Sequence, residues 1–152
     1  ERLMKILDWQ RNGGNSTIKE LRKCDEQLQR DIVTFISEFE LYDEIEVGGK
    51  QFVLVHAGLR NFSPEKELWE YGLDELVWEK MDYRKVYFKD KYVITGHTPT
   101  MAIRENPHPG YIYQANNHIA IDCGCCFPGG RLGCLRLDDM KEFYVEAEEV
   151  CL

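Results

Sequence analysis

The sequence lacks any hydrophobic run long enough to cross a membrane, and it is short of positive charge. No apolar segment approaches the ~20 residues that a transmembrane helix needs. Lys and Arg number 19 against 27 Asp and Glu, so the formal net charge is −8. Nucleic acids and anionic membranes repel an acidic chain, because both are negatively charged. We therefore expect no nucleic-acid partner and no membrane partner. A cytoplasmic location is expected on another ground, because the cysteines of this chain are interpreted as reduced thiols.

Repeats, low-complexity tracts and long linkers are also missing, and a length of 152 residues suits one domain or part of one. The six cysteines are not spread along the chain as in a disulfide-stapled scaffold. Four of them lie in one stretch: Cys123, Cys125, Cys126 and Cys134. Structural zinc sites usually repeat a pair of cysteines on two knuckles, which this cluster does not do. We interpret these residues as reduced thiols, buried or in loops, that act as small hydrophobic residues.

Hydrophobic periodicity predicts helices in the first forty residues. Apolar side chains recur every three or four positions between Leu21 and Phe39, on one face of a helix or of two consecutive helices. Thr17 and Glu20 have the spacing of a capping box, which would begin this helix. A short helix around Ile6 is predicted before a glycine-containing turn at 12–15.

The hydrophobic period then changes to that of strands. We predict strands at 45–47 and 51–55, joined by a hairpin turn at Gly48-Gly49, and a further strand at 92–95. A helix is predicted over 73–81, and short strands at 111–113, 118–123, 132–137 and 142–145. This order of elements indicates an α/β or α+β layered fold. Trp69 and Trp78 are predicted to anchor the core, whereas His108 and His118 are predicted to face solvent.

Two hydrophobic strands end in a histidine with small or turn-forming neighbours. One strand runs into His56 before Ala57-Gly58, and the other runs through Gly96 into His97. Ligands bind beyond the carboxyl ends of strands in open α/β sheets, and neutral imidazole is a common ligand of transition metals. A single histidine in such a place is more often solvated or bonded to a carbonyl than bound to a metal. Two in the same setting predict nitrogens that converge on one point.

These motifs resemble the phosphoprotein phosphatase (serine/threonine-type) branch of the calcineurin-like metallophosphoesterase family. Segment 55–58 (VHAG) is similar to the family's H-[AG]-G motif, and segment 96–99 (GHTP) to its G-H-T-P motif. Segment 74–78 (DELVW) resembles the stretch between these motifs, and 121–124 (IDCG) the strand after them. Residues 9–17 look like the stretch that follows the family's G-N-H-E motif. The resemblance therefore extends along nearly the whole chain.

The resemblance implies a β-sandwich flanked by helices, of which residues 1–152 would form the second half, as the C-terminal part of one domain. The family's first three motifs, G-D-x-H-G, G-D-x-x-D-R-G and G-N-H-[DE], do not occur in this sequence and would lie before Glu1. In the family they supply the other metal ligands and the histidine regarded as the general acid. We therefore expect no catalytic residue in this chain. The resemblance implies that His56 and His97 bind one of two divalent metals, manganese, iron or zinc, and that this piece alone binds them weakly or not at all.

Substrate binding is the second role that the resemblance implies. Lys80 stands where the family's W-x-R pattern would place an arginine that clamps the substrate phosphate, and Arg84 follows closely. Lysine keeps the positive charge but loses the planar fork that binds two oxygens. We expect Lys80 and Arg84 to attract phosphate.

The function implied is a metal-dependent phosphoester hydrolase, first of all a serine/threonine-type protein phosphatase, inactive as this piece. Its substrate would be a phosphorylated protein or a small phosphoester. Two alternatives stay open: a symmetrical dinucleoside tetraphosphate hydrolase, whose motifs are closely similar, and a non-catalytic interaction module or pseudo-phosphatase. Half a sandwich would leave an open sheet edge and uncovered apolar surface, so self-association is also expected.

Overall fold

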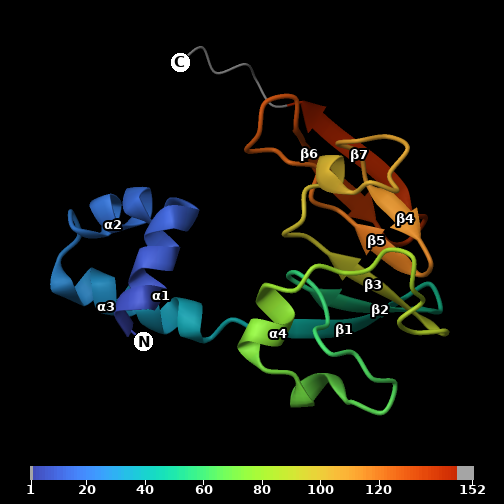
Figure 1. The fold of residues 1–152 in the computed structure, drawn as a ribbon, viewed down its shortest axis with the longest axis horizontal. Coiled ribbons are helices and arrows are strands. Elements are labelled where there is room, and N and C mark those ends of the chain that lie inside the picture. The colour runs from blue at the N-terminus through green and yellow to red at the C-terminus, as the bar shows by residue number, and fades with distance from the viewer. Residues whose placement is uncertain (1, 147–152) are drawn as a thin grey trace. The chain divides into compact units, whose positions relative to one another are not determined.

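The computed structural model describes residues 2–146, and the chain divides into two compact units, Glu1–Glu40 and Leu41–Leu152. The first unit is helical, and the second contains the strands of the described chain (Figure 1). No helix within residues 2–146 combines the length and the apolar character needed to cross a membrane.

The helical unit consists of α1 (Arg2–Trp9), a π-helical turn (Gln10–Gly14), α2 (Asn15–Leu21) and α3 (Glu26–Ser37). The kink lies at Gly13, whose φ of +90° is in the left-handed region. The capping box predicted at Thr17 does not form, because the chain enters α2 directly from the π-helical turn and Thr17 lies inside the helix. The N-cap is found instead at α3, where Oδ1 of Asp25 accepts the backbone N–H of Leu28 at 2.8 Å.

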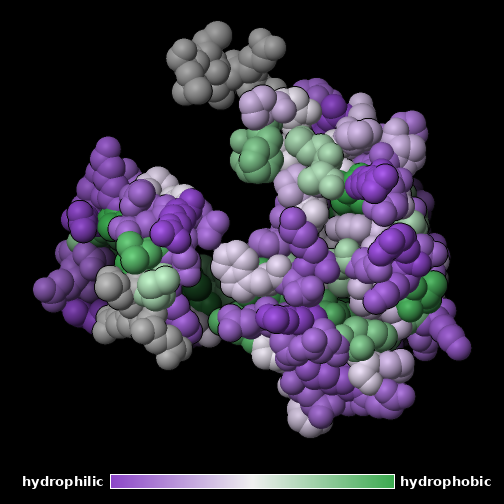
Figure 2. Space-filling model, in the orientation of Figure 1, coloured by the Kyte–Doolittle hydropathy of each residue, from purple (hydrophilic) through white to green (hydrophobic). Residues whose placement is uncertain are grey.

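The apolar side chains of α1 and α3 lie largely on the surface of this unit. Leu28, Phe35 and Phe39, which belong to the predicted apolar face, are all exposed. Phe35 and Phe39 pack edge to face, with ring centroids 5.1 Å apart. Figure 2 shows hydrophobic patches among the hydrophilic residues of the helical unit. The predicted helical periodicity is therefore confirmed, but it describes an exposed face rather than a core.

The second unit is built on a five-stranded mixed sheet of order β1-β2-β3-β5-β4. Its strands are β1 (Tyr42–Val47), β2 (Lys50–Val55), β3 (Lys91–Thr95), β4 (Tyr113–Ala115) and β5 (His118–Ala120). Strands β2, β3 and β5 run parallel to one another, whereas the edge strands β1 and β4 are antiparallel to their neighbours. The predicted hairpin turn at Gly48-Gly49 is confirmed, with φ angles of +58° and +77° that glycine adopts without strain.

Both faces of this sheet are covered. The hairpin of β6 (Arg131–Arg136) and β7 (Lys141–Glu146) places Leu135 and Tyr144 against a cluster that includes Phe52 and Ile119. On the other face, Val53 and Val93 belong to a second cluster with Leu76 of α4 (Leu73–Val77). The structure is therefore mixed α+β with a mixed sheet, as the layered prediction required.

The helix predicted over 73–81 ends at Val77, so Trp78 and Lys80 lie in the loop that follows. The prediction that Trp69 and Trp78 anchor the core is wrong, because their exposed fractions are 73% and 57%. Smaller or more flexible residues, among them Leu76 and Met81, fill this side of the core instead. The shorter helix turns the Trp78 ring outward, toward the ends of β2 and β3.

His118 and the cysteines also differ from expectation. His118 is buried, with an exposed fraction of 1%, because it begins β5, an inner strand between β3 and β4. Its Nε2 lies 2.7 Å from Oγ1 of Thr95, and its ring stacks on Tyr83 with centroids 4.6 Å apart. In the cysteine cluster, only Cys123 is buried, whereas the three others are exposed: Cys125, Cys126 and Cys134. Cys125 and Cys126 lie in a turn, so the interpretation as buried or loop thiols holds for three members but not for Cys134, which is exposed in β6.

Candidate functional site

Two neighbouring parallel strands bring His56 and His97 to the same edge of the sheet. Val55 at the end of β2 pairs with Thr95 at the end of β3, and each histidine follows within two residues. The backbone N–H of Gly96 continues the ladder by donating to the carbonyl oxygen of His56 at 2.9 Å. Because the ladder fixes both backbones, the two imidazoles start from neighbouring positions.

One nitrogen of each imidazole ring points toward the other ring. Nε2 of His56 lies 3.2 Å from Nδ1 of His97, with ring centroids 5.0 Å apart and an angle of 59° between the planes. The convergence predicted from the two strand ends is therefore confirmed. That these nitrogens hold a metal stays a prediction.

The backbone at His97 is strained. Its φ of +63° lies in the left-handed region, which a residue with a Cβ atom rarely adopts. The turn is closed tightly by the N–H of Thr98, which donates to the carbonyl of Gly96 at 2.6 Å. A strained non-glycine residue persists only where the surrounding structure holds it, and such residues cluster at functional sites. This conformation directs the His97 ring toward His56.

Burial and nearby positive charge lower the pKa of His97, so its ring stays neutral at a lower pH than an ordinary imidazole does. Burial is the largest cause that lowers the pKa of His97, followed by the charges of His56 and Lys80, while Asp122 opposes the shift. Trp78 packs edge to face on the ring, with centroids 5.7 Å apart and planes at 90°. Neutral imidazole is the form that coordinates a metal, so the shift favours ligand chemistry near neutral pH.

Gly58 allows the loop after α4 to lie against the turn that contains His56. A Cβ atom at Gly58 would meet the carbonyl oxygen of Glu79 at 2.5 Å and Sδ of Met81 at 2.8 Å. The same loop is held by the N–H groups of Ala57 and Gly58, which donate to the carbonyl of Leu76 at 2.9 and 3.3 Å. The small residues after His56 therefore serve close backbone packing.

The separation of the two nitrogens fits a shared metal. Bonds of about 2.0–2.1 Å at a tetrahedral angle would place two imidazole nitrogens about 3.3 Å apart, close to the observed 3.2 Å. The same distance suits a hydrogen bond between two neutral rings. Within residues 2–146, no group of three or more His, Cys, Asp and Glu side chains is placed to hold an ion. The geometry therefore fits two ligands of one metal as well as a hydrogen bond, and the described residues group no third ligand with the pair.

The two predicted phosphate-binding residues occupy different environments. Lys80 lines a cavity of about 310 Å³ and is close enough to His97 to lower the pKa of that ring. Arg84 is exposed and binds Asp82 with both ends of its guanidinium, at 2.8 and 3.1 Å. This pairing lowers the pKa of Asp82 to about 2. Lys80 therefore lies near the histidine pair with its charge available, whereas Arg84 is engaged by a carboxylate.

Sequence reasoning missed several residues around the histidine pair. Trp78 was assigned to the core but contacts His97. Asp122 influences His97 electrostatically, and its Oδ1 accepts the N–H of Gly124 at 2.9 Å. Arg60 and Lys85 line the cavity beside Lys80, but neither belongs to a sequence motif that would have drawn attention to it. The segments 74–78 and 121–124 did stand out in the sequence, but their spacing alone could not say which side chain reaches the site.

No model of a known protein family matches this chain, and a comparison with curated proteins gives no match.

Proposed function

We propose that this chain forms part of the metal-binding end of a metal-dependent phosphoester hydrolase, of the serine/threonine-type protein phosphatase branch of the calcineurin-like metallophosphoesterases. The observation that carries the proposal is the 3.2 Å separation between Nε2 of His56 and Nδ1 of His97 at the ends of adjacent parallel strands. The layered architecture supports it, because a mixed sheet covered by a two-stranded hairpin is compatible with half of a β-sandwich.

In this proposal the residues have distinct roles. His56 and His97 would be the two nitrogen ligands of one divalent ion, with Trp78 restricting the His97 ring. A metal bound there would polarise a phosphoryl oxygen and lower the pKa of a bound water. Lys80 would attract the phosphate dianion through its charge, without the two-point orientation that arginine gives. The general acid and the other metal ligands would come from residues outside this chain.

Hydrolysis of para-nitrophenyl phosphate with Mn²⁺ tests the proposal. The chain alone should hydrolyse little, because its described residues bring two metal ligands together. A longer form that carries the three missing motifs should turn over, and His56→Ala in that form should lower the rate by orders of magnitude. His108→Ala is the matched control, because His108 is an exposed histidine away from both strand ends. A near-normal rate for His56→Ala would contradict the proposal.

A non-catalytic interaction module is the second candidate. It is favoured by one observation, namely that no group of three potential metal ligands occurs in the described part of the chain. This candidate predicts that a longer form binds no Mn²⁺ at His56 and His97 and shows no turnover. Metal-dependent hydrolysis that is lost in His56→Ala would exclude it.

A further inference from the structure

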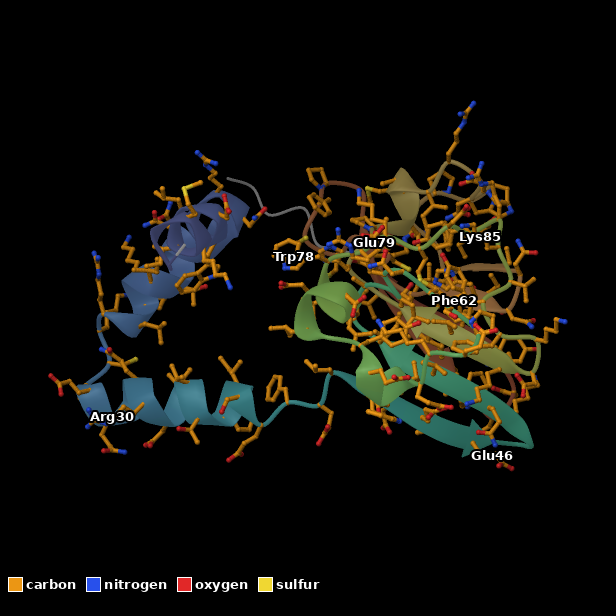
Figure 3. The ribbon with its side chains drawn as sticks, turned by 60° about the horizontal axis from the view of Figure 1, so that its bottom comes forward. Arg30, Glu46, Phe62, Trp78, Glu79 and Lys85 are labelled. Atoms are coloured by element: carbon orange, nitrogen blue, oxygen red, sulfur yellow. The ribbon has the colours of Figure 1, made fainter. Side chains whose placement is uncertain are left out.

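A cavity beside Lys80 is lined by positive charge and aromatic rings. Its volume is about 310 Å³, and its walls come from two segments, 59–62 after β2 and 79–87 after α4. Figure 3 labels Phe62 of the first segment and Glu79 and Lys85 of the second, which border the cavity together. Because Gly58 lets these two segments approach closely, the cavity adjoins the turn that contains His56.

Both carboxylates that line the cavity are engaged by arginines. Oε2 of Glu79 lies 3.8 Å from Nε of Arg60, and Asp82 binds Arg84 at 2.8 Å. These pairs neutralise the acidic side chains. The Arg60–Glu79 pair is about half exposed and therefore weak.

Lys80 and Lys85 supply positive charge to the same cavity. Neither ammonium group forms an ion pair or hydrogen bond with any side chain between residues 4 and 146. A net charge of −8 disfavours indiscriminate binding of anions to the chain. Lys80 and Lys85 share a concave surface whose carboxylates are already paired. This surface is therefore locally positive on an acidic chain, which suits an anionic group.

Two aromatic residues, Phe62 and Tyr87, also line the cavity, and packing holds their rings. Phe62 packs edge to face on Tyr87, with centroids 5.1 Å apart, and on Phe88, with centroids 5.2 Å apart. The hydroxyl oxygen of Tyr87 accepts the backbone N–H of Asp82 at 2.9 Å. These contacts hold the backbone of the 79–87 loop in place, whereas the side chains of Lys80 and Lys85 are exposed.

We propose that this cavity binds a second anionic group of the substrate, displaced from the phosphate that Lys80 attracts toward the histidine pair. The inference rests on the proposed function for the identity of the first phosphate. The chemistry is a second phosphate or a carboxylate, held by Lys85. The substrate class is then a polyanion rather than an isolated phosphomonoester.

Binding of inorganic tripolyphosphate to the chain, in EDTA and without metal, tests this inference. Amide signals of residues 59–62 and 79–87 in NMR spectra should shift on addition of tripolyphosphate. Their shifts should all fit the same dissociation constant. Lys85→Ala should weaken that affinity about five- to tenfold, as expected for loss of a charge-assisted contact. Lys89→Ala is the matched control, since it removes the same charge from an exposed lysine outside the cavity. Citrate, titrated in parallel, separates a preference for carboxylate from one for phosphate.

Equal affinities for Lys85→Ala and the unaltered chain, or an equal loss in Lys89→Ala, would overturn the inference. Signals that shift elsewhere on the chain while those of 59–62 and 79–87 stay still would overturn it as well. Because EDTA removes metals and no hydrolysis is measured, this result is separate from the proposed function. Failure of metal binding at His56 and His97 with tripolyphosphate binding intact would reject the metal site alone.

Discussion

Nε2 of His56 and Nδ1 of His97 lie 3.2 Å apart although 41 positions separate them in sequence. The backbone explains this contact, because Val55 pairs with Thr95 and the N–H of Gly96 bonds to the carbonyl of His56. A parallel ladder thus places both side chains before any ligand is present. Preformed ligands reduce the conformational entropy lost on binding.

Replacing Gly58 with alanine should destabilise the strand-bearing unit. The added Cβ would meet the carbonyl oxygen of Glu79 at 2.5 Å, so the loop after α4 must shift. We expect a loss of about 1–3 kcal/mol in the free energy of unfolding, as for other overpacked sites. Gly96→Ala is the control, because its nearest contact would be an ordinary 3.6 Å. Urea unfolding followed by NMR signals of β3 measures both, and equal stability of the two variants would refute the packing role of Gly58.

Acid should destabilise the same unit through His118. Burial lowers the pKa of His118 to about 4, and its Nδ1 is buried without a hydrogen-bond partner in the described structure. The unfolded state, with a pKa near 6.5, therefore takes up a proton before the folded state does. The contribution of this neutral ring to stability is present above pH 6.5 and is lost as the pH falls toward 4. Between pH 8 and pH 5 the loss amounts to about 2 kcal/mol.

The variant His118→Gln isolates this effect from the titration of the carboxylates. Its free energy of unfolding should fall by about 2 kcal/mol less than that of the unaltered chain between pH 8 and pH 5. His108→Gln, at an exposed histidine, is the control for the loss of an imidazole outside the core. Parallel pH dependence in the unaltered chain and His118→Gln would show that the buried ring does not titrate as described.

The cysteine cluster should react unevenly with iodoacetamide. Burial raises the pKa of the Cys123 thiol, and Gly133 packs so closely that a Cβ there would lie 2.6 Å from the sulfur. Cys125 and Cys126 are exposed. Because the thiolate is the nucleophile, we expect these two to be alkylated at least ~10-fold faster than Cys123, as measured by peptide mass spectrometry. In urea the rates should converge, and rapid native alkylation of Cys123 would contradict its burial.

The sequence predicted the strands and the histidine pair because both are encoded locally. Alternating or continuous apolar residues mark β2 and β3; His56 directly follows β2, and His97 follows β3 after Gly96. Trp78 and His118 were misplaced because their environments come from distant segments. His118 is buried by Thr95 and Tyr83, which lie 23 and 35 positions away, and no local pattern records such a contact. The cavity was missed for the same reason, since Arg60 and Lys85 meet only after two loops pack together.

Titration with Mn²⁺ while the ring signals of all four histidines are observed by NMR tests the metal site most directly. The chain alone should bind Mn²⁺ weakly, so broadening should need a high concentration, but it should affect His56 and His97 together and before the others, with His108 as the exposed control and His118 as the buried one. His97→Gly accepts the left-handed backbone but removes the ligand, so it should abolish early broadening of His56. Broadening of His108 at the same concentration as His56, or early broadening of His56 that persists in His97→Gly, would contradict a shared metal site.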